Sequence, residues 1–254
     1  MRKIFAILLI FTLIYPVLQS TENSKVEAAA KVKADTSQYF ITPEKFTKQE
    51  TTSRITLKQG PWTVSAIKQK STVLPSTTID SITVTNGTIK FSIPFEDKPA
   101  TITSISLSSS NKYLAIQTGY SSGNKLLVVN LNNGTYKIIN DLVKSATAVE
   151  TVTAYSWSPN GQKLALAYGD PSTSRIAIYN VFYNSLTYVP REVSTITTAY
   201  IFWDKKGAFI DFESEYPSDT FKLYRYSLDT KKTKVIRDLD SAEIVEIIKL
   251  NNHF

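Results

Sequence analysis

The sequence predicts an all-β fold that is built from repeated four-stranded units. From Arg54 onward, short β-branched and aromatic runs alternate with Gly, Pro, Asn and Asp, which is the pattern of strands and turns. Asn86-Gly87 separates two alternating apolar runs, and Asn-Gly in that position is the strongest short-range signal of a β-hairpin. After the first 30 residues no segment sustains helical spacing, although 141–150 and 241–250 are each compatible with a short helix.

The second observation is an internal repeat of three units. Two sets of positions keep spacings of 50 and then 46 residues along the chain. They are Leu107, Trp157 and Trp203 in the first strand, and Asn111, Gly161 and Gly207 in the turn that follows. Three units of four strands, with a period of about 40–50 residues, are typical of β-propeller blades.

A family resemblance rests on particular strings within these repeats. Residues 156–165, read as SWSPNGQKLA, resemble the WSPDGKxLA signature of TolB-like β-propellers, which are similar to WD-repeat proteins. Residues 131–134 (LNNG) and 228–231 (LDTK) resemble the D-x-x-T-G hairpin of that family. The resemblance covers about residues 101–240 and is weakest in the first repeat, where Leu107 and Ser109 replace Trp and Pro. It implies that each tryptophan anchors its blade against the neighbouring blade.

The repeats organise the remainder of the chain. We expect a polar linker at 31–53, an N-terminal β segment or diverged blade at 54–100, and the three propeller-like repeats at 101–240. Residues 241–254 are either a C-terminal tail or the start of a further blade. A closed propeller needs at least about four blades. Either the N-terminal β segment is a blade completed by the C-terminal strand, or the array of about three to four blades is open and incomplete.

Residues 1–30 are expected to form a cleaved secretory signal. Two basic residues precede an apolar run at 4–18, which has the length of a signal core and is short for a membrane span of roughly 20 residues. Small residues at 28–30 offer a cleavage site, and cleavage nearer Ser20 is also open. We therefore expect cleavage between residues 18 and 30 and no stable membrane span afterwards. The alternative is an uncleaved N-terminal anchor.

The composition argues against most kinds of catalytic site. The chain has no cysteine and a single histidine, His253, beside the C-terminus. Zinc sites, thiol nucleophiles and hydrolytic triads need these residue types, so none is expected. No serine lies in a G-x-S-x-G elbow, and the chain has no glycine-rich phosphate loop. The sequence predicts no catalytic residue and no cofactor.

The charge bears on the class of partner. The net charge is +7, and it becomes +6 once residues 1–30, with three bases and two acids, are removed. A basic exported protein suits an anionic cell wall or phospholipid headgroups, whereas charge spread over many strands serves solubility alone. Because no block of five like charges is present, nucleic acid is not an expected partner.

The segment 209–215 carries an unusual polar cluster. Strand alternation places Asp211, Glu213 and Glu215 on one face, opposite Ile210 and Phe212. Three carboxylates are too costly to bury unpaired between blades. We expect this face to lie in water because no blade covers it. The alternative is a metal site, or a site for a basic partner, made of clustered oxygens.

The loops after each second strand form another candidate binding surface. Stacked blades bring equivalent loops to one rim, where propellers usually bind ligands. The residues expected on that rim are Tyr120, Asp170, Tyr216 and Asp219. Ordinary polar turn composition is the alternative interpretation.

These observations predict a non-catalytic, exported binding or scaffold module of the cell envelope that resembles TolB-like propellers. Its partner would be another envelope protein or a cell-wall polymer, and its location secreted or cell-wall associated. Two alternatives stay open. One is an accessory propeller fragment of a secreted hydrolase system, which the resemblance also implies, and the other is a truncated propeller without retained activity.

Overall fold

The computed structural model describes residues 36–42, 45–72, 75–143, 150–170, 173–191, 198–214 and 221–250, with side chains up to residue 247. The predicted signal at 1–30 and His253 lie outside these residues. Within the described ranges, no helix is both long and apolar enough to cross a membrane.

The first sheet corresponds to the predicted N-terminal β segment. Its antiparallel strands follow chain order: β1 (Thr47–Glu50), β2 (Arg54–Gln59), β3 (Trp62–Lys70), β4 (Thr77–Thr85) and β5 (Lys90–Pro94). Apolar and polar residues alternate along β2, β3 and β4, so one face is buried and the other is polar. The turn predicted at Asn86-Gly87 joins β4 to β5, and Gly87 adopts a φ of 92°. Part of the expected linker is structured, because it contains β1 and the buried Phe46.

The three sequence repeats form the second, third and fourth sheets, each with four antiparallel strands in chain order. The second sheet holds β6 (Thr101–Leu107), β7 (Tyr113–Tyr120), β8 (Gly123–Asn130) and β9 (Tyr136–Ile138). The third holds β10 (Thr151–Trp157), β11 (Lys163–Asp170), β12 (Thr173–Asn180) and β13 (Ser185–Val189). The fourth holds β14 (Ile201–Trp203), β15 (Phe209–Glu213), β16 (Phe221–Ser227) and β17 (Thr233–Leu239). The all-β prediction is confirmed.

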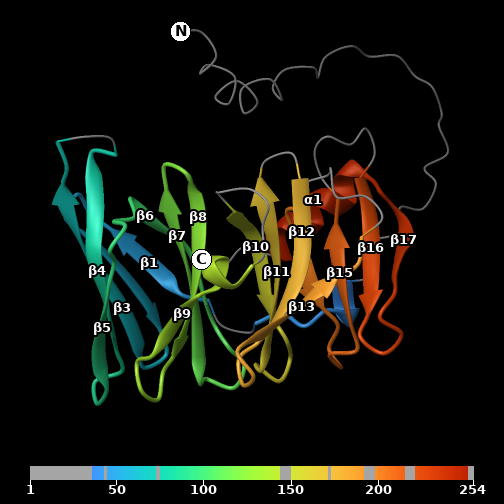
Figure 1. Cartoon of the computed structure of the whole chain (residues 1–254), viewed down its shortest axis with the longest axis horizontal. Coiled ribbons are helices and arrows are strands. Elements are labelled where there is room, and N and C mark those ends of the chain that lie inside the picture. The colour runs from blue at the N-terminus through green and yellow to red at the C-terminus, as the bar shows by residue number, and fades with distance from the viewer. Residues whose placement is uncertain are drawn as a thin grey trace, which may run out of the picture. The chain divides into compact units, whose positions relative to one another are not determined.

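Consecutive sheets pack on one another through separate apolar clusters, and Figure 1 shows them following one another in chain order. Trp157 and Trp203 are fully buried in two of these clusters. The indole nitrogen of Trp157 donates to the Ser106 carbonyl at 3.1 Å, and that of Trp203 donates to the Ser156 carbonyl at 2.9 Å. Both acceptors belong to the preceding sheet, so each tryptophan ties its sheet to the one before.

The turns between first and second strands confirm the repeat alignment. Each has a residue with positive φ at the equivalent position, and these are Asn111 (56°), Gly161 (64°) and Gly207 (70°). Each turn also opens with a side-chain oxygen that accepts a backbone N–H from the following strand, at 2.9–3.0 Å. These acceptors are Ser108, Ser158 and Asp204. The three turns are therefore built in the same way, although only the second has the full signature.

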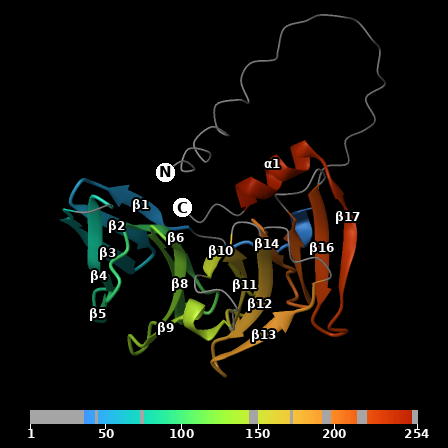
Figure 2. The same ribbon diagram turned by 45° about the horizontal axis from the view of Figure 1, so that its top comes forward.

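Three short helical segments accompany the sheets in the described residues, and the first is a 3₁₀ turn, η1 (Thr36–Gln38), that precedes β1. A 3₁₀ turn, η2 (Ile139–Leu142), follows β9, and α1 (Ser241–Leu250) follows β17. Asp240 and Glu243 form a reciprocal capping box at the start of α1, with N–H to carboxylate distances of 2.8 and 3.1 Å. Ile247 of α1 is buried against the fourth sheet, as Figure 2 shows for the helix as a whole. The short helix that the sequence allows at 241–250 is observed, and residues 251–254 lie outside the described residues.

Candidate functional site

The acidic strand β15 is covered, so our expectation of a face in water is wrong. Asp211 and Glu213 are fully buried, with 0% and 1% of their surfaces exposed. Arg225 on β16 donates from Nε and from one terminal nitrogen to the two carboxylate oxygens of Asp211, at 2.7 and 2.8 Å. The Tyr39 hydroxyl donates to the same carboxylate at 2.8 Å.

Tyr39 reaches Asp211 because residues 38–40 pair with the end of β14 and the two residues after it. The Phe40 N–H donates to the Trp203 carbonyl at 2.8 Å, and the Lys205 N–H donates to the Gln38 carbonyl at 2.9 Å. The pKa of Tyr39 is raised well above its usual value, mainly by burial of the phenol and next by the negative charge of Asp211. The Asp211 carboxylate is thus buried but paired. Residues 36–42 and α1 lie against the face of the fourth sheet that we expected to be in water.

The network bears on the predicted metal site. Both oxygens of Asp211 are engaged by Arg225, and Glu215 lies outside the described residues. Across the ranges that the structure describes, no group of three or more His, Cys, Asp or Glu side chains is placed to hold a metal ion. Asp211 is therefore the partner of the Arg225 guanidinium and the Tyr39 phenol.

The predicted rim is described only in part, because Tyr216 and Asp219 lie outside the described residues. Tyr120 ends β7, and its ring lies 4.9 Å from Nζ of Lys125, which pairs with Asp97 at 2.8 Å. Asp170 ends β11, and its carboxylate accepts the Thr173 N–H at 2.8 Å, which closes the β11–β12 hairpin. Asp170 therefore has a local structural role.

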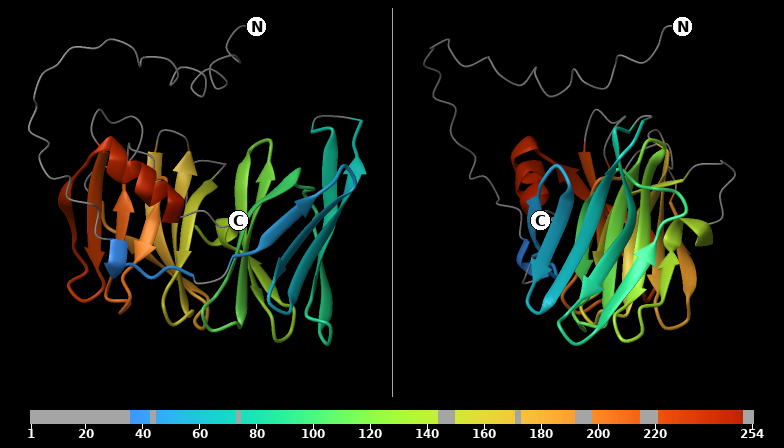
Figure 3. Two further views of the ribbon diagram at one scale, coloured as in Figure 1. Left: turned by 180° about the vertical axis from the view of Figure 1, so that it is seen from behind. Right: turned by 90° about the vertical axis from the view of Figure 1, so that its left-hand side faces the viewer.

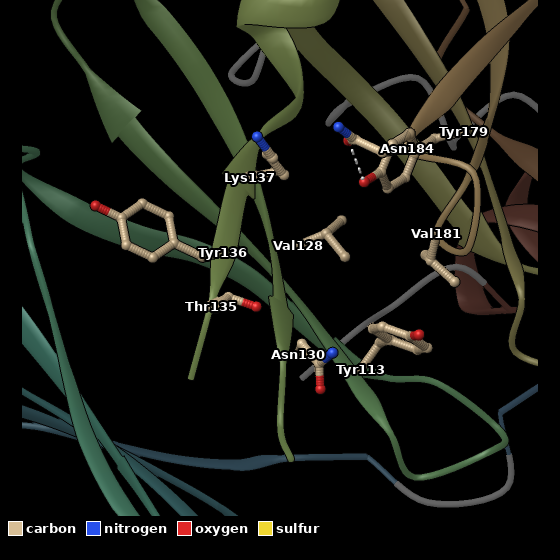
Figure 4. Close-up of a pocket in the computed structure, with 9 residues that line it drawn as sticks. All are labelled: Tyr113, Val128, Asn130, Thr135, Tyr136, Lys137, Tyr179, Val181 and Asn184. Atoms are coloured by element: carbon tan, nitrogen blue, oxygen red, sulfur yellow. Dashed lines mark hydrogen bonds between the residues drawn. The ribbon is translucent and has the colours of Figure 1, made fainter. Parts of the chain in front are cut away.

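A cleft of about 200 Å³ lies at the other end of these strands, between the second and third sheets. It is bordered by the β8–β9 and β12–β13 turns (Figure 4). Its lining residues are Tyr113, Val128, Asn130, Thr135, Tyr136, Lys137, Tyr179, Val181 and Asn184. The lining thus combines aromatic and aliphatic surface with a few polar groups, as in many ligand sites.

Two tyrosines from adjacent sheets line the cleft. Tyr113 begins β7 and stacks near Trp157, with ring centroids 6.4 Å apart at an angle of 29°. Tyr179 comes from β12, and its hydroxyl donates to the Asn184 side chain at 3.0 Å. The pKa of Tyr179 is raised, mainly by burial of its phenol and next by its proximity to Tyr113. Figure 4 shows both rings on the cleft, whereas the ring of Tyr136 points away from the other side chains.

A solved structure that superposes with a TM-score above 0.5 agrees with this architecture. No protein-family model matches the chain. The dipeptidyl peptidase 4 structure from Porphyromonas gingivalis superposes with a TM-score of 0.53 at 9% identity, over 80% of this chain and 41% of that one. TolB from Acinetobacter baumannii matches with a TM-score of 0.43 at 17% identity, over 72% of this chain and 41% of that one. The chain has a propeller-like fold. At these identities the likeness concerns the fold alone.

Sequence relatives match a short part of the chain. Over 68 residues the chain is 28% identical to a component of eukaryotic translation initiation factor 3 from Aedes aegypti. That match includes 27% of this chain and 10% of the relative, so the chain spans about a tenth of the length of the curated relatives it matches.

An exposed aromatic pair lies beside the cleft, and we did not predict it. Phe182 and Tyr183, in the turn between β12 and β13, are 79% and 72% exposed. Their rings meet edge to face, with centroids 5.1 Å apart at 88°. The Asn180 side chain accepts both backbone N–H groups, at 3.0 and 3.1 Å, which holds the turn in place. We call residues 181–184 the aromatic turn.

The repeats themselves contain the signal for this turn. The equivalent turns of the second and fourth sheets read LNNG and LDTK, whereas the third reads VFYN. All three have positive φ at the last position, at Gly134, Asn184 and Lys231, so their backbones correspond. Two aromatic residues therefore stand where the other blades have small polar ones. Packing within the blade does not explain them, because they are exposed.

Proposed function

We propose that this protein is an exported, non-catalytic binding module of the cell envelope, and that a protein partner docks at the cleft and the aromatic turn. The observation that carries the proposal is the exposure of Phe182 and Tyr183 beside a tyrosine-lined cleft. Large aromatic side chains are enriched at the energetic centres of protein interfaces. Burying each against a partner contributes about 1.5–3 kcal/mol, so leaving both in water is unfavourable.

The cleft supplies the second part of the interface. Its volume suits one inserted side chain of a partner, with Tyr113 and Tyr179 as apolar walls. Asn130 and Lys137 add hydrogen-bond donors at the margin. An exposed aromatic pair next to a small cleft with a polar margin fits a protein surface with one protruding side chain.

Docking is tested by site-specific photocrosslinking in the cells that naturally produce the protein. A photoreactive phenylalanine at Phe182 should give one discrete adduct, and the Phe182→Ser/Tyr183→Ser variant carrying the probe at Tyr136 should not. The matched control is a probe at Val235, which is 50% exposed on β17. Equal crosslinking at Phe182 and Val235, or none at Phe182, would contradict the proposal.

Export is tested separately. The basic start, the apolar run and the small residues at 28–30 support removal of a signal. N-terminal sequencing of protein from the culture medium or the wall fraction should give a first residue between 19 and 31, which corresponds to cleavage after one of residues 18–30. Recovery from membranes alone, with Met1 intact, would contradict export by cleavage.

A further inference from the structure

The polar face of the first sheet, which we call the outer face, presents two ordered rows of side chains. Register pairing places Lys58, Thr63, Thr85 and Lys90 next to one another across β2, β3, β4 and β5. The adjacent row is Thr56, Ser65, Thr83 and Ser92. Six of these eight side chains carry hydroxyl groups, and the remaining two are lysines that flank the first row.

The opposite face of the same strands is core. Its buried side chains include Ile55, Leu57, Val64, Ile82 and Val84, which pack on the second sheet. The outer face therefore rests on a rigid platform. The right-hand view of Figure 3 looks onto this sheet, and no other described strand or helix lies in front of it.

The outer face is positively charged, and its polar groups are available. Arg54, Lys58 and Lys90 are exposed and have no carboxylate partner among the described residues. The acidic side chains in the strands of this sheet are Glu50 and Asp80. Glu50 pairs with Lys48 and Lys68, and Asp80 pairs with Lys98 at 2.8 Å. No acid in these strands therefore neutralises the three cations.

Most of the hydroxyl groups are also uncommitted. In the described part of the chain, those of Thr56, Thr63, Ser65 and Thr83 make no hydrogen bond, whereas Ser92 donates to the Ile82 carbonyl at 3.4 Å. Each free hydroxyl offers one donor and two acceptor positions. Neighbouring strands lie about 4.8 Å apart, so Lys58 and Lys90 are about 14 Å apart with two threonines between them.

We propose that the outer face binds an anionic phosphodiester polymer with a hydroxylated repeat, of the poly(glycerol phosphate) kind that occurs in cell walls. The two lysines and Arg54 pair with phosphates, and the hydroxyl rows bond to the polyol units between them. The rows contain no aromatic ring on which a nucleic-acid base would stack. They also contain no large apolar anchor for a protein partner; Ile67, at 54% exposure, is the one exposed aliphatic side chain of β3.

The test measures binding of the purified chain, without residues 1–30, to poly(glycerol phosphate). We expect saturable binding that weakens as salt rises, because phosphate contacts release counterions. Lys58→Glu/Lys90→Glu should weaken binding at least tenfold. The matched control is Lys232→Glu/Lys234→Glu, which makes the same charge change at two exposed positions, one just before β17 and one within it, and should alter binding less than twofold.

Two further comparisons test the assigned chemistry. Thr56→Val/Thr83→Val keeps the charge and the β-branched shape, and should weaken binding three- to tenfold if the hydroxyls take part. Single-stranded DNA has the same charge repeat without free polyol hydroxyls, and should bind at least tenfold more weakly than poly(glycerol phosphate).

Three results would overturn the proposal. They are no binding by the parent chain, equal losses in the two lysine variants, or equal binding of DNA. Circular dichroism confirms that each variant is folded. Because the outer face belongs to the first sheet and the aromatic turn to the third, Phe182→Ser/Tyr183→Ser should bind the polymer normally. Failure of polymer binding at the outer face would therefore not contradict docking at the aromatic turn, and failure of docking would not contradict polymer binding.

Discussion

Replacing Asp211 with asparagine should lower the free energy of unfolding by about 3 kcal/mol. The substitution keeps the size of the side chain and removes its charge, which leaves the guanidinium of Arg225 without its counterion. Removing one partner of a buried ion pair typically costs about 3–5 kcal/mol. We expect the lower end, because the Arg225 side chain is 24% exposed and water can reach part of it.

Tyr39 provides an internal check on this reasoning. Tyr39→Phe removes a hydrogen bond to a buried carboxylate and should cost about 1.5–3 kcal/mol. Its effect in the Asp211→Asn background should be smaller, because the acceptor has lost its charge. The measurement is urea unfolding of the four proteins of a double-mutant cycle, followed by tryptophan fluorescence and circular dichroism.

The competing expectation, a carboxylate in water, predicts a cost within about 0.5 kcal/mol for Asp211→Asn, as for most surface substitutions. That result, with independent effects of the two substitutions, would refute the covered-face interpretation. The same samples test the metal alternative. A melting temperature that rises with calcium in the parent chain, but not in Asp211→Asn, would assign a cation to this strand.

Four further substitutions test the packing between blades. Trp157→Ala should cost about 3–5 kcal/mol in urea unfolding, as large aromatic truncations in cores do, and parental stability would contradict the repeat alignment. Gly161→Ala should cost more than Gly207→Ala, for which we expect about 1 kcal/mol from the positive φ alone, because an added Cβ at Gly161 would lie 2.7 Å from the Ser110 nitrogen. Burial raises the pKa of Tyr155, so its contribution to stability is present below about pH 10 and is lost as the pH rises; Tyr155→Phe should flatten that alkaline decline in melting temperature.

Much of the blade architecture could be predicted from local patterns. The hairpin at Asn86-Gly87 and the positive-φ positions Asn111, Gly161 and Gly207 depend on residues close in the chain. A turn that requires positive φ selects glycine or asparagine, and an alternating strand selects its own buried face. Such constraints repeat with each blade, so the period remains visible where the signature is incomplete.

The binding surfaces were only partly predictable. The aromatic turn was missed although VFYN differs from LNNG and LDTK, because exposure of Phe182 and Tyr183 follows from how the hairpin projects beyond its sheet. The outer face of the first sheet was not predicted, and its rows depend on the register of the strands. A one-residue slip in any strand would have sent its hydroxyls into the core.

Sequence alone determined the strands, the turns and the repeated unit, because backbone conformation and side-chain alternation are local properties. It did not determine the environment of Asp211, and the expectation built on alternation and chain position was wrong. Tyr39 lies 172 residues away in sequence, and no local pattern relates it to this carboxylate. Only the tertiary structure places residues 36–42 and α1 against this face of the fourth sheet. Burying an unpaired carboxylate is unfavourable because of its desolvation cost. For Asp211 that cost is offset, because its carboxylate pairs with the guanidinium of Arg225 and the phenol of Tyr39.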